Sequence, residues 1–143
     1  MSLFGPESRF PSLSQAALGA LETALRAALA REPKVRLAFL FGSAARGESF
    51  HDIDIGVELD EPFRGLELRG LSLRLWEAAG RPQFELDVVP LNDAPPSFRE
   101  EVSTTGRVLF ERWPRYAHDF AVQALSDIID FRQAERIVEK EQG

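Results

Sequence analysis

The sequence predicts an α/β protein, with α+β segments in two layers and helices packed on a mixed β-sheet. The main observation is that helical spacing and strand-like runs alternate along the 143 residues. Strand-like runs follow one another both directly and through a helix, so antiparallel and parallel pairing are both expected. Hydrophobic residues make up 44% and charged residues 28% of the chain, which is typical of one globular domain with its own core.

The first half of the chain predicts one helix followed by two strands. Ser12 and Gln15 have the spacing of a capping box, and Pro33 limits the helix that follows. The apolar run at 35–41 is typical of a buried strand. Apolar and polar residues alternate over 52–59, which predicts a strand with one buried face. The apolar stripe of the helix consists of Leu18, Leu21, Leu25, Ala28 and Leu29.

The second half predicts a helix at 65–79, a strand at 84–89, a short helix at 96–103 and an edge strand at 107–111. A long helix follows from Pro114. We therefore divide the chain into a domain at 1–113 and a C-terminal helix at 114–143. The apolar stripe of that last helix either packs on its own sheet, the commoner outcome, or binds a partner.

Composition excludes several classes of function. The chain has no cysteine, which excludes disulfide scaffolds and thiolate metal sites. Its net charge is -6, from 17 Lys+Arg against 23 Asp+Glu, so we expect no direct binding of nucleic acid. No segment resembles a signal peptide or a membrane span, and we expect a cytoplasmic protein.

A phosphate-binding turn is one interpretation of Gly42 and Ser43, which follow the predicted strand at 35–41. Glycine lets a large ligand group approach the backbone, and the free amides of a helix start favour an anion. Arg46 is the nearby cation that we expect beside a phosphate. Taken alone, the Gly-Ser pair is explained equally well by an ordinary turn.

A metal site is indicated by three aspartates. Asp52 and Asp54 share one face of a predicted strand, within about 7 Å of each other. A divalent cation such as Mg²⁺ would offset their repulsion, although two solvent-facing aspartates are the simpler alternative. Asp87 lies in the middle of an apolar strand. If that strand is a neighbour, the three acids suit two cations about 3.5–4 Å apart.

Together these residues resemble the nucleotidyltransferase superfamily, and most closely its minimal nucleotidyltransferase (MNT) branch. The resemblance rests on Gly42-Ser43, Arg46-Gly47, Asp52-Ile53-Asp54 and Asp87. It implies a palm-like sheet related to that of DNA polymerase beta and two Mg²⁺ ions. It also implies nucleotide binding at the Gly-Ser turn and Arg46, with metal binding and catalysis at the three aspartates. His51 departs from the pattern, because many relatives have serine before the Asp-x-Asp motif.

The resemblance further implies that the protein is the antitoxin of a HEPN/MNT toxin–antitoxin pair. Such a protein would transfer AMP from ATP to a hydroxyl, a tyrosine in particular, of the HEPN-type toxin. The short chain leaves no second domain for an acceptor, so we expect the partner to complete the site in a homo- or hetero-oligomer. Two alternatives stay open: neutralisation of the toxin by binding alone, and nucleotidyl transfer to a small molecule.

Overall fold

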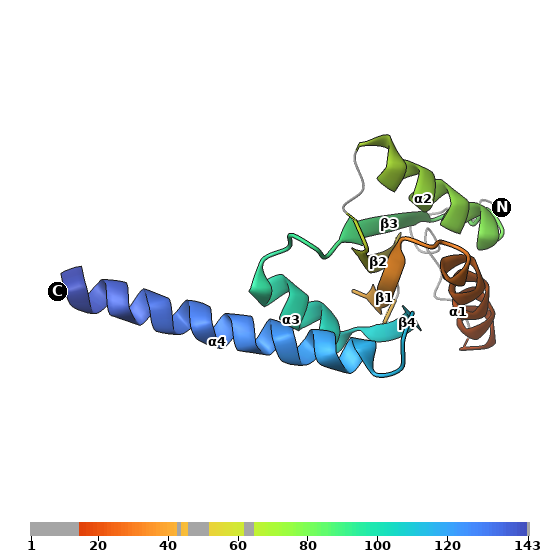
Figure 1. Ribbon diagram of the computed structural model, residues 1–143. Helices are drawn as coiled ribbons and strands as arrows, with labels where there is room; N and C mark the ends of the chain where they lie inside the picture. The colour runs from red at the N-terminus through yellow and green to blue at the C-terminus, as the bar shows by residue number, and fades with distance from the viewer. Residues whose placement is uncertain (1–14, 43, 46–51, 62–64, 143) are drawn as a thin grey trace, which may run out of the picture.

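Four helices and four strands make up the computed structural model, which describes residues 15–42, 44–45, 52–61 and 65–142 (Figure 1). Every helix and strand that the sequence predicts is present, and each predicted end that falls in the described residues lies within three residues of the observed one. Ser12, the predicted cap of the first helix, lies outside the described residues. The elements are α1 (Gln15–Ala30), β1 (Val35–Phe41), β2 (Asp52–Leu59), α2 (Leu66–Ala78), β3 (Glu85–Pro90), α3 (Pro96–Thr105), β4 (Arg107–Glu111) and α4 (Tyr116–Gln142).

The four strands form one mixed sheet in the order β3-β2-β1-β4. Strand β1 runs antiparallel to β2 and β4, whereas β2 runs parallel to β3. The strands of the parallel pair are connected by helix α2, which returns the chain to the end of the sheet at which β2 begins. The mixed sheet, and the position of β4 at its edge, confirm the predicted architecture.

Both faces of β1 are covered, which explains why its sequence is apolar throughout. Leu40 lies on the face covered by α1 and α2, in the larger of two hydrophobic clusters. Leu37 and Phe39 lie on the opposite face, in a cluster with residues from α3 and α4. Phe39 packs there on Phe120 of α4, with 5.7 Å between the ring centroids. The two helix pairs therefore pack on β1 from opposite sides (Figure 1).

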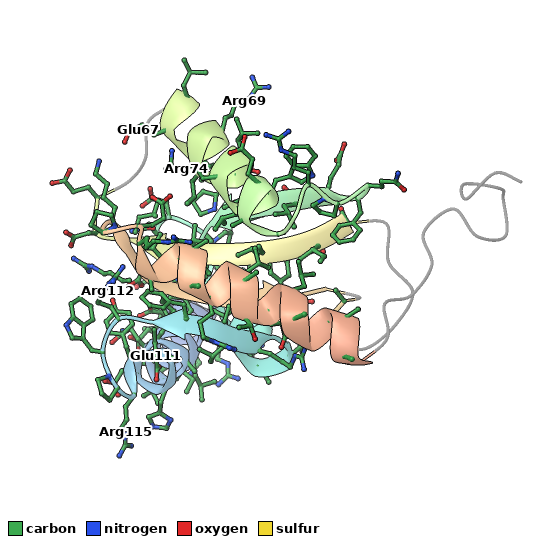
Figure 2. All side chains as sticks on the ribbon, turned by 90° about the vertical axis from the view of Figure 1, so that its right-hand side faces the viewer. Glu67, Arg69, Arg74, Glu111, Arg112 and Arg115 are labelled. Atoms are coloured by element: carbon green, nitrogen blue, oxygen red, sulfur yellow. The ribbon has the colours of Figure 1, made fainter. Side chains whose placement is uncertain are left out.

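Two side chains next to each other at the end of β4 tie helix ends to the sheet (Figure 2). The guanidinium of Arg112 donates to the carbonyl oxygens of Glu32 and Val35, at 2.7 and 2.8 Å. The carboxylate of Glu111 accepts a hydrogen bond from the backbone N–H of Ala117, at 2.9 Å. Arg112 thereby satisfies carbonyls after the end of α1, and Glu111 caps the start of α4.

Helix α4 packs along its first turns and then extends beyond the rest of the fold (Figure 1). Ala124 and Ile128 are buried against the body of the protein. Leu125 and Phe131 of the same helix are 51% and 60% exposed, although their spacing places them with its predicted apolar stripe. The helix therefore serves the core over only part of its length. Within the described residues, no helix combines the length and the hydropathy needed to cross a bilayer.

Candidate active site

The three aspartates meet on one face of the sheet. Asp52 and Asp54 lie at the start of β2, and Asp87 on β3 is the parallel register partner of Asp54. One carboxylate oxygen from each residue lies within 4.8 Å of the others. The expectation that the two strands are neighbours is confirmed, and their parallel register places the third acid beside the first two.

The chemistry of this group fits a hard divalent cation. Asp52 and Asp54 are half-buried and Asp87 is exposed, so an ion has access to all three. Three negative charges at this separation repel one another, and carboxylate oxygens are the ligands that Mg²⁺ prefers. Glu85 is the register partner of Asp52 and shares the strand face of Asp87. Its carboxylate is nevertheless not part of the group.

Gly42 stands directly against this group, at the end of β1. Its φ is +77°, a left-handed conformation that favours glycine. A Cβ atom at this position would collide with the carboxylate of Asp54. The sequence pattern indicated that glycine here admits a ligand, and the structure adds that it also admits Asp54. Ser43 and Arg46, the other predicted nucleotide-binding residues, and His51 lie outside the described residues.

An aromatic side chain that the sequence reasoning missed lies on the same face as the acids. Phe41 is the cross-strand partner of Asp54 and so points to that face. Phe98, near the start of α3, packs on Phe41 edge to face, with ring centroids 5.7 Å apart. No local pattern marks Phe98, because its partner is 57 positions away in the sequence. The contact brings α3 up to the end of the sheet that carries the acids.

The chain matches the family described as "Polymerase beta, Nucleotidyltransferase" over residues 23–115. This span contains Gly42 and all three aspartates. No curated protein matches the chain.

Solved structures of toxin–antitoxin complexes contain chains that are similar to this one. A chain of a toxin–antitoxin with AMP-PNP is 28% identical at a TM-score of 0.65, with 85% of this chain and 98% of that chain covered. A chain of tri-AMPylated Shewanella oneidensis HEPN toxin in complex with MNT antitoxin is 26% identical at a TM-score of 0.60, over 92% and 100%. A chain of the toxin–antitoxin MntA-HepT is 26% identical at a TM-score of 0.59, over 91% and 100%.

These matches agree with the geometry of the site. The family model covers most of the chain, and the solved structures extend the likeness to nearly its whole length. The predicted palm-like fold and the resemblance to MNT proteins are confirmed. The chain belongs to the polymerase beta nucleotidyltransferase family.

Proposed function

We propose that this protein is an Mg²⁺-dependent nucleotidyltransferase that transfers AMP from ATP to a tyrosine hydroxyl of a HEPN-type toxin, and so acts as an antitoxin. The observation that carries the proposal is the meeting of Asp52, Asp54 and Asp87 beside Gly42, on the fold of this family. The similar complexes support it, since one contains AMP-PNP and another an AMPylated HEPN toxin. We infer that the protein works in the cytoplasm, where ATP and Mg²⁺ are supplied.

The positions of the residues suggest separate roles in binding metal and nucleotide. Asp52 and Asp54 would hold two Mg²⁺ ions together with Asp87, and bound Mg²⁺ would neutralise charge on the phosphates. Gly42, with Ser43 and Arg46, would receive the triphosphate. Such reactions depend mainly on positioning and charge compensation, which an open carboxylate group on a rigid sheet provides.

The transfer forms one bond to the α-phosphorus and breaks another. The acceptor hydroxyl gives its proton to the carboxylate of Asp87, and its oxygen attacks the α-phosphorus of ATP. The bond from that phosphorus to the oxygen bridging to the β-phosphate breaks, and pyrophosphate leaves with the electron pair. The product is a tyrosine ester of AMP. Asp87 suits this role because it lies on an edge strand and is the most exposed of the three acids.

Label transfer tests the proposal directly. The protein is incubated with Mg²⁺, ATP labelled at the α-phosphate and the HEPN-type protein encoded by the neighbouring gene. We expect label on a tyrosine of that protein, and a loss of about 10³-fold in the Asp52→Asn/Asp54→Asn variant. Glu101→Gln, an exposed carboxylate on α3, is the matched control and should transfer normally. Absence of label with the wild type, or equal transfer by the double variant, would contradict the proposal.

Metal binding has a second readout that needs no activity. An ion that binds only the folded state stabilises it, by about 2.7 kcal/mol at 100 times its Kd. We therefore expect Mg²⁺ to raise the Tm of the wild type and of Glu101→Gln. The Asp52→Asn/Asp54→Asn variant should show no such rise.

A second candidate function is neutralisation of the toxin by binding alone, and the surface of α4 favours it. The far part of this helix exposes large apolar residues, which is typical of a surface that meets a partner. They are Ile129, Phe131, Ile137 and Val138. We accordingly propose 1–113 as the catalytic domain and 114–143 as a helix that serves both the core and the partner.

Neutralisation in cells separates the two candidates. If binding suffices, Asp52→Asn/Asp54→Asn should still neutralise the toxin, whereas Ile137→Asp/Val138→Asp should not. If transfer is required, the aspartate variant should fail although it still binds. Co-purification of each variant with the toxin measures binding independently of activity.

A further inference from the structure

An open pocket of about 400 Å³ lies between the end of β3 and the start of α3. Val89 and Pro90 of β3 form one wall and Phe98 of α3 forms another, with the connecting segment 92–95 between them. The lining is largely apolar and includes one aromatic ring. The transfer chemistry described above makes no use of this pocket, although the pocket lies on the same face of the sheet as the acids.

Two structural relations place the pocket beside the acidic group. Val89 lies two residues after Asp87 on β3, so both side chains point to the same face of the sheet, about 7 Å apart. Phe98 packs on Phe41, whose cross-strand partner is Asp54. One wall of the pocket is therefore a near neighbour of Asp87 along β3, and the other wall is connected to Asp54 through Phe41. A side chain seated in the pocket lies within reach of Asp87.

The pocket also lies on the side from which an acceptor must approach. In an in-line displacement, the attacking oxygen and the leaving group are on opposite sides of the phosphorus. Gly42, the proposed triphosphate position, ends β1, whereas Asp87 lies on β3 at the outer edge of the sheet. With pyrophosphate toward β1, the attacking hydroxyl comes from the β3 side. That is the side of the pocket.

The wall formed by 92–95 is held in place by hydrogen bonds to the sheet. The side-chain oxygen of Asn92 accepts from the N–H of Leu59 at 2.9 Å, and its amide donates to the carbonyl of Leu59 at 2.7 Å. The N–H of Leu91 donates to the carbonyl of Val57 at 2.7 Å. A preformed apolar pocket binds a rigid ring at a low cost in conformational entropy.

We propose that this pocket binds the aromatic ring of the acceptor tyrosine and so directs its hydroxyl to Asp87. The inference rests on the proposed transfer to tyrosine and adds where the acceptor lies. The ring packs between Val89 and Phe98 with its long axis along β3, so that its hydroxyl points toward Asp87. Phe98 offers the edge-to-face contact that aromatic pairs favour. We call this site the acceptor pocket.

A substitution that fills the acceptor pocket tests the inference. Val89→Trp should raise the KM for the toxin about tenfold or more, because the ring loses its place, and leave the KM for ATP unchanged. Val108→Trp is the matched control, since Val108 lies on β4 at the opposite edge of the sheet and is 43% exposed. A rise in the KM for ATP would overturn the inference, because the pocket would then hold the base. Equal KM values for the toxin in both variants would overturn it too.

A competition experiment on the wild type does not depend on the folding of any variant. N-acetyltyrosine amide should inhibit label transfer competitively against the toxin and not against ATP, whereas N-acetylalanine amide should have no effect. Absence of inhibition by the tyrosine compound would overturn the inference alone, provided that the wild type transfers label. Absence of any label transfer would overturn the proposed function and the acceptor pocket with it.

Discussion

The two ends of the sheet use charged residues in opposite ways. At the start of β2, like charges gather, with three carboxylates within 4.8 Å of one another. At the other end of β2 and around α2, acids alternate with bases, and Figure 2 shows Glu67 and Arg74 of this region on α2. The guanidinium groups of Arg36 and Arg74 donate hydrogen bonds to Asp60 and Glu32, respectively, and these bonds raise the pKa values of both arginines. The ion pairs are Lys34–Glu67, Arg36–Asp60 and Arg74–Glu32.

The difference separates residues that serve the fold from residues that serve a ligand. Opposite charges in contact add a little stability at the surface, typically below about 1 kcal/mol for each pair. Like charges in contact destabilise the folded chain, so folding alone gives no reason to gather them. We call the end of the sheet with Asp52, Asp54 and Asp87 the acidic end, and the opposite end, where acids pair with bases, the paired end. We expect substitutions at the acidic end to change activity most, and substitutions at the paired end to change only stability.

Among the single substitutions, the largest effect is expected from Gly42→Ala, which disturbs the acidic group. The new Cβ would collide with Asp54, and alanine at a φ of +77° is strained by about 1–3 kcal/mol. Label transfer should fall about 100-fold because a displaced carboxylate no longer holds its ligand in place. Gly19→Ala is the matched control, because nothing lies within 4 Å of the Cβ it adds to α1. Normal transfer by Gly42→Ala would contradict the site.

A smaller effect, confined to stability, is expected from Arg112→Met at the paired end. The variant loses the hydrogen bonds from the guanidinium to the carbonyls after α1, and the free energy of unfolding should fall by about 2 kcal/mol. Urea denaturation measures this loss, and label transfer by the folded protein should be unchanged. Arg69→Met, an exposed position on α2, should stay within about 0.5 kcal/mol of the wild type. Impaired transfer by folded Arg112→Met would remove the distinction between the two ends.

The contribution of Tyr116 to stability is expected to depend on pH. Its hydroxyl donates to the carboxylate of Glu58, and burial, followed by that carboxylate, raises the pKa of Tyr116 above its usual value of 10.0. A raised pKa means that the neutral hydroxyl stabilises the fold below pH 10.0, and that this stability is lost as the pH rises through the raised value. Tyr116→Phe should therefore cost about 1 kcal/mol at neutral pH and progressively less above pH 10. A cost that stays constant into alkaline pH would contradict this reasoning.

The smallest effect is expected from Lys34→Met, which breaks the ion pair with Glu67. The two charged groups are 3.2 Å apart, and both side chains are nearly half exposed. The free energy of unfolding should fall by about 0.5 kcal/mol or less, and the difference should shrink in high salt. Denaturation at two salt concentrations measures it. A loss above about 1 kcal/mol would mean that the paired end contributes more than surface ion pairs usually do.

Local sequence patterns determined the elements of this protein. The apolar run at 35–41, the alternation over 52–59 and the helical stripes depend only on neighbouring residues, and each corresponds to an element of the structure. The common face of Asp52 and Asp54 follows from the same period of two. The acidic pair was therefore predictable without knowledge of any other strand.

Only the tertiary structure decided what meets this pair. Asp87 joins it because β3 lies beside β2 in one particular parallel register, and strand order and register depend on packing between distant segments. The close approach of Gly42 to Asp54, the contact of Phe98 with Phe41 and the partial burial of α4 are non-local in the same way. Short-range periodicity predicts on which face of its element a side chain lies. Which distant residues share that face is determined only by the tertiary structure.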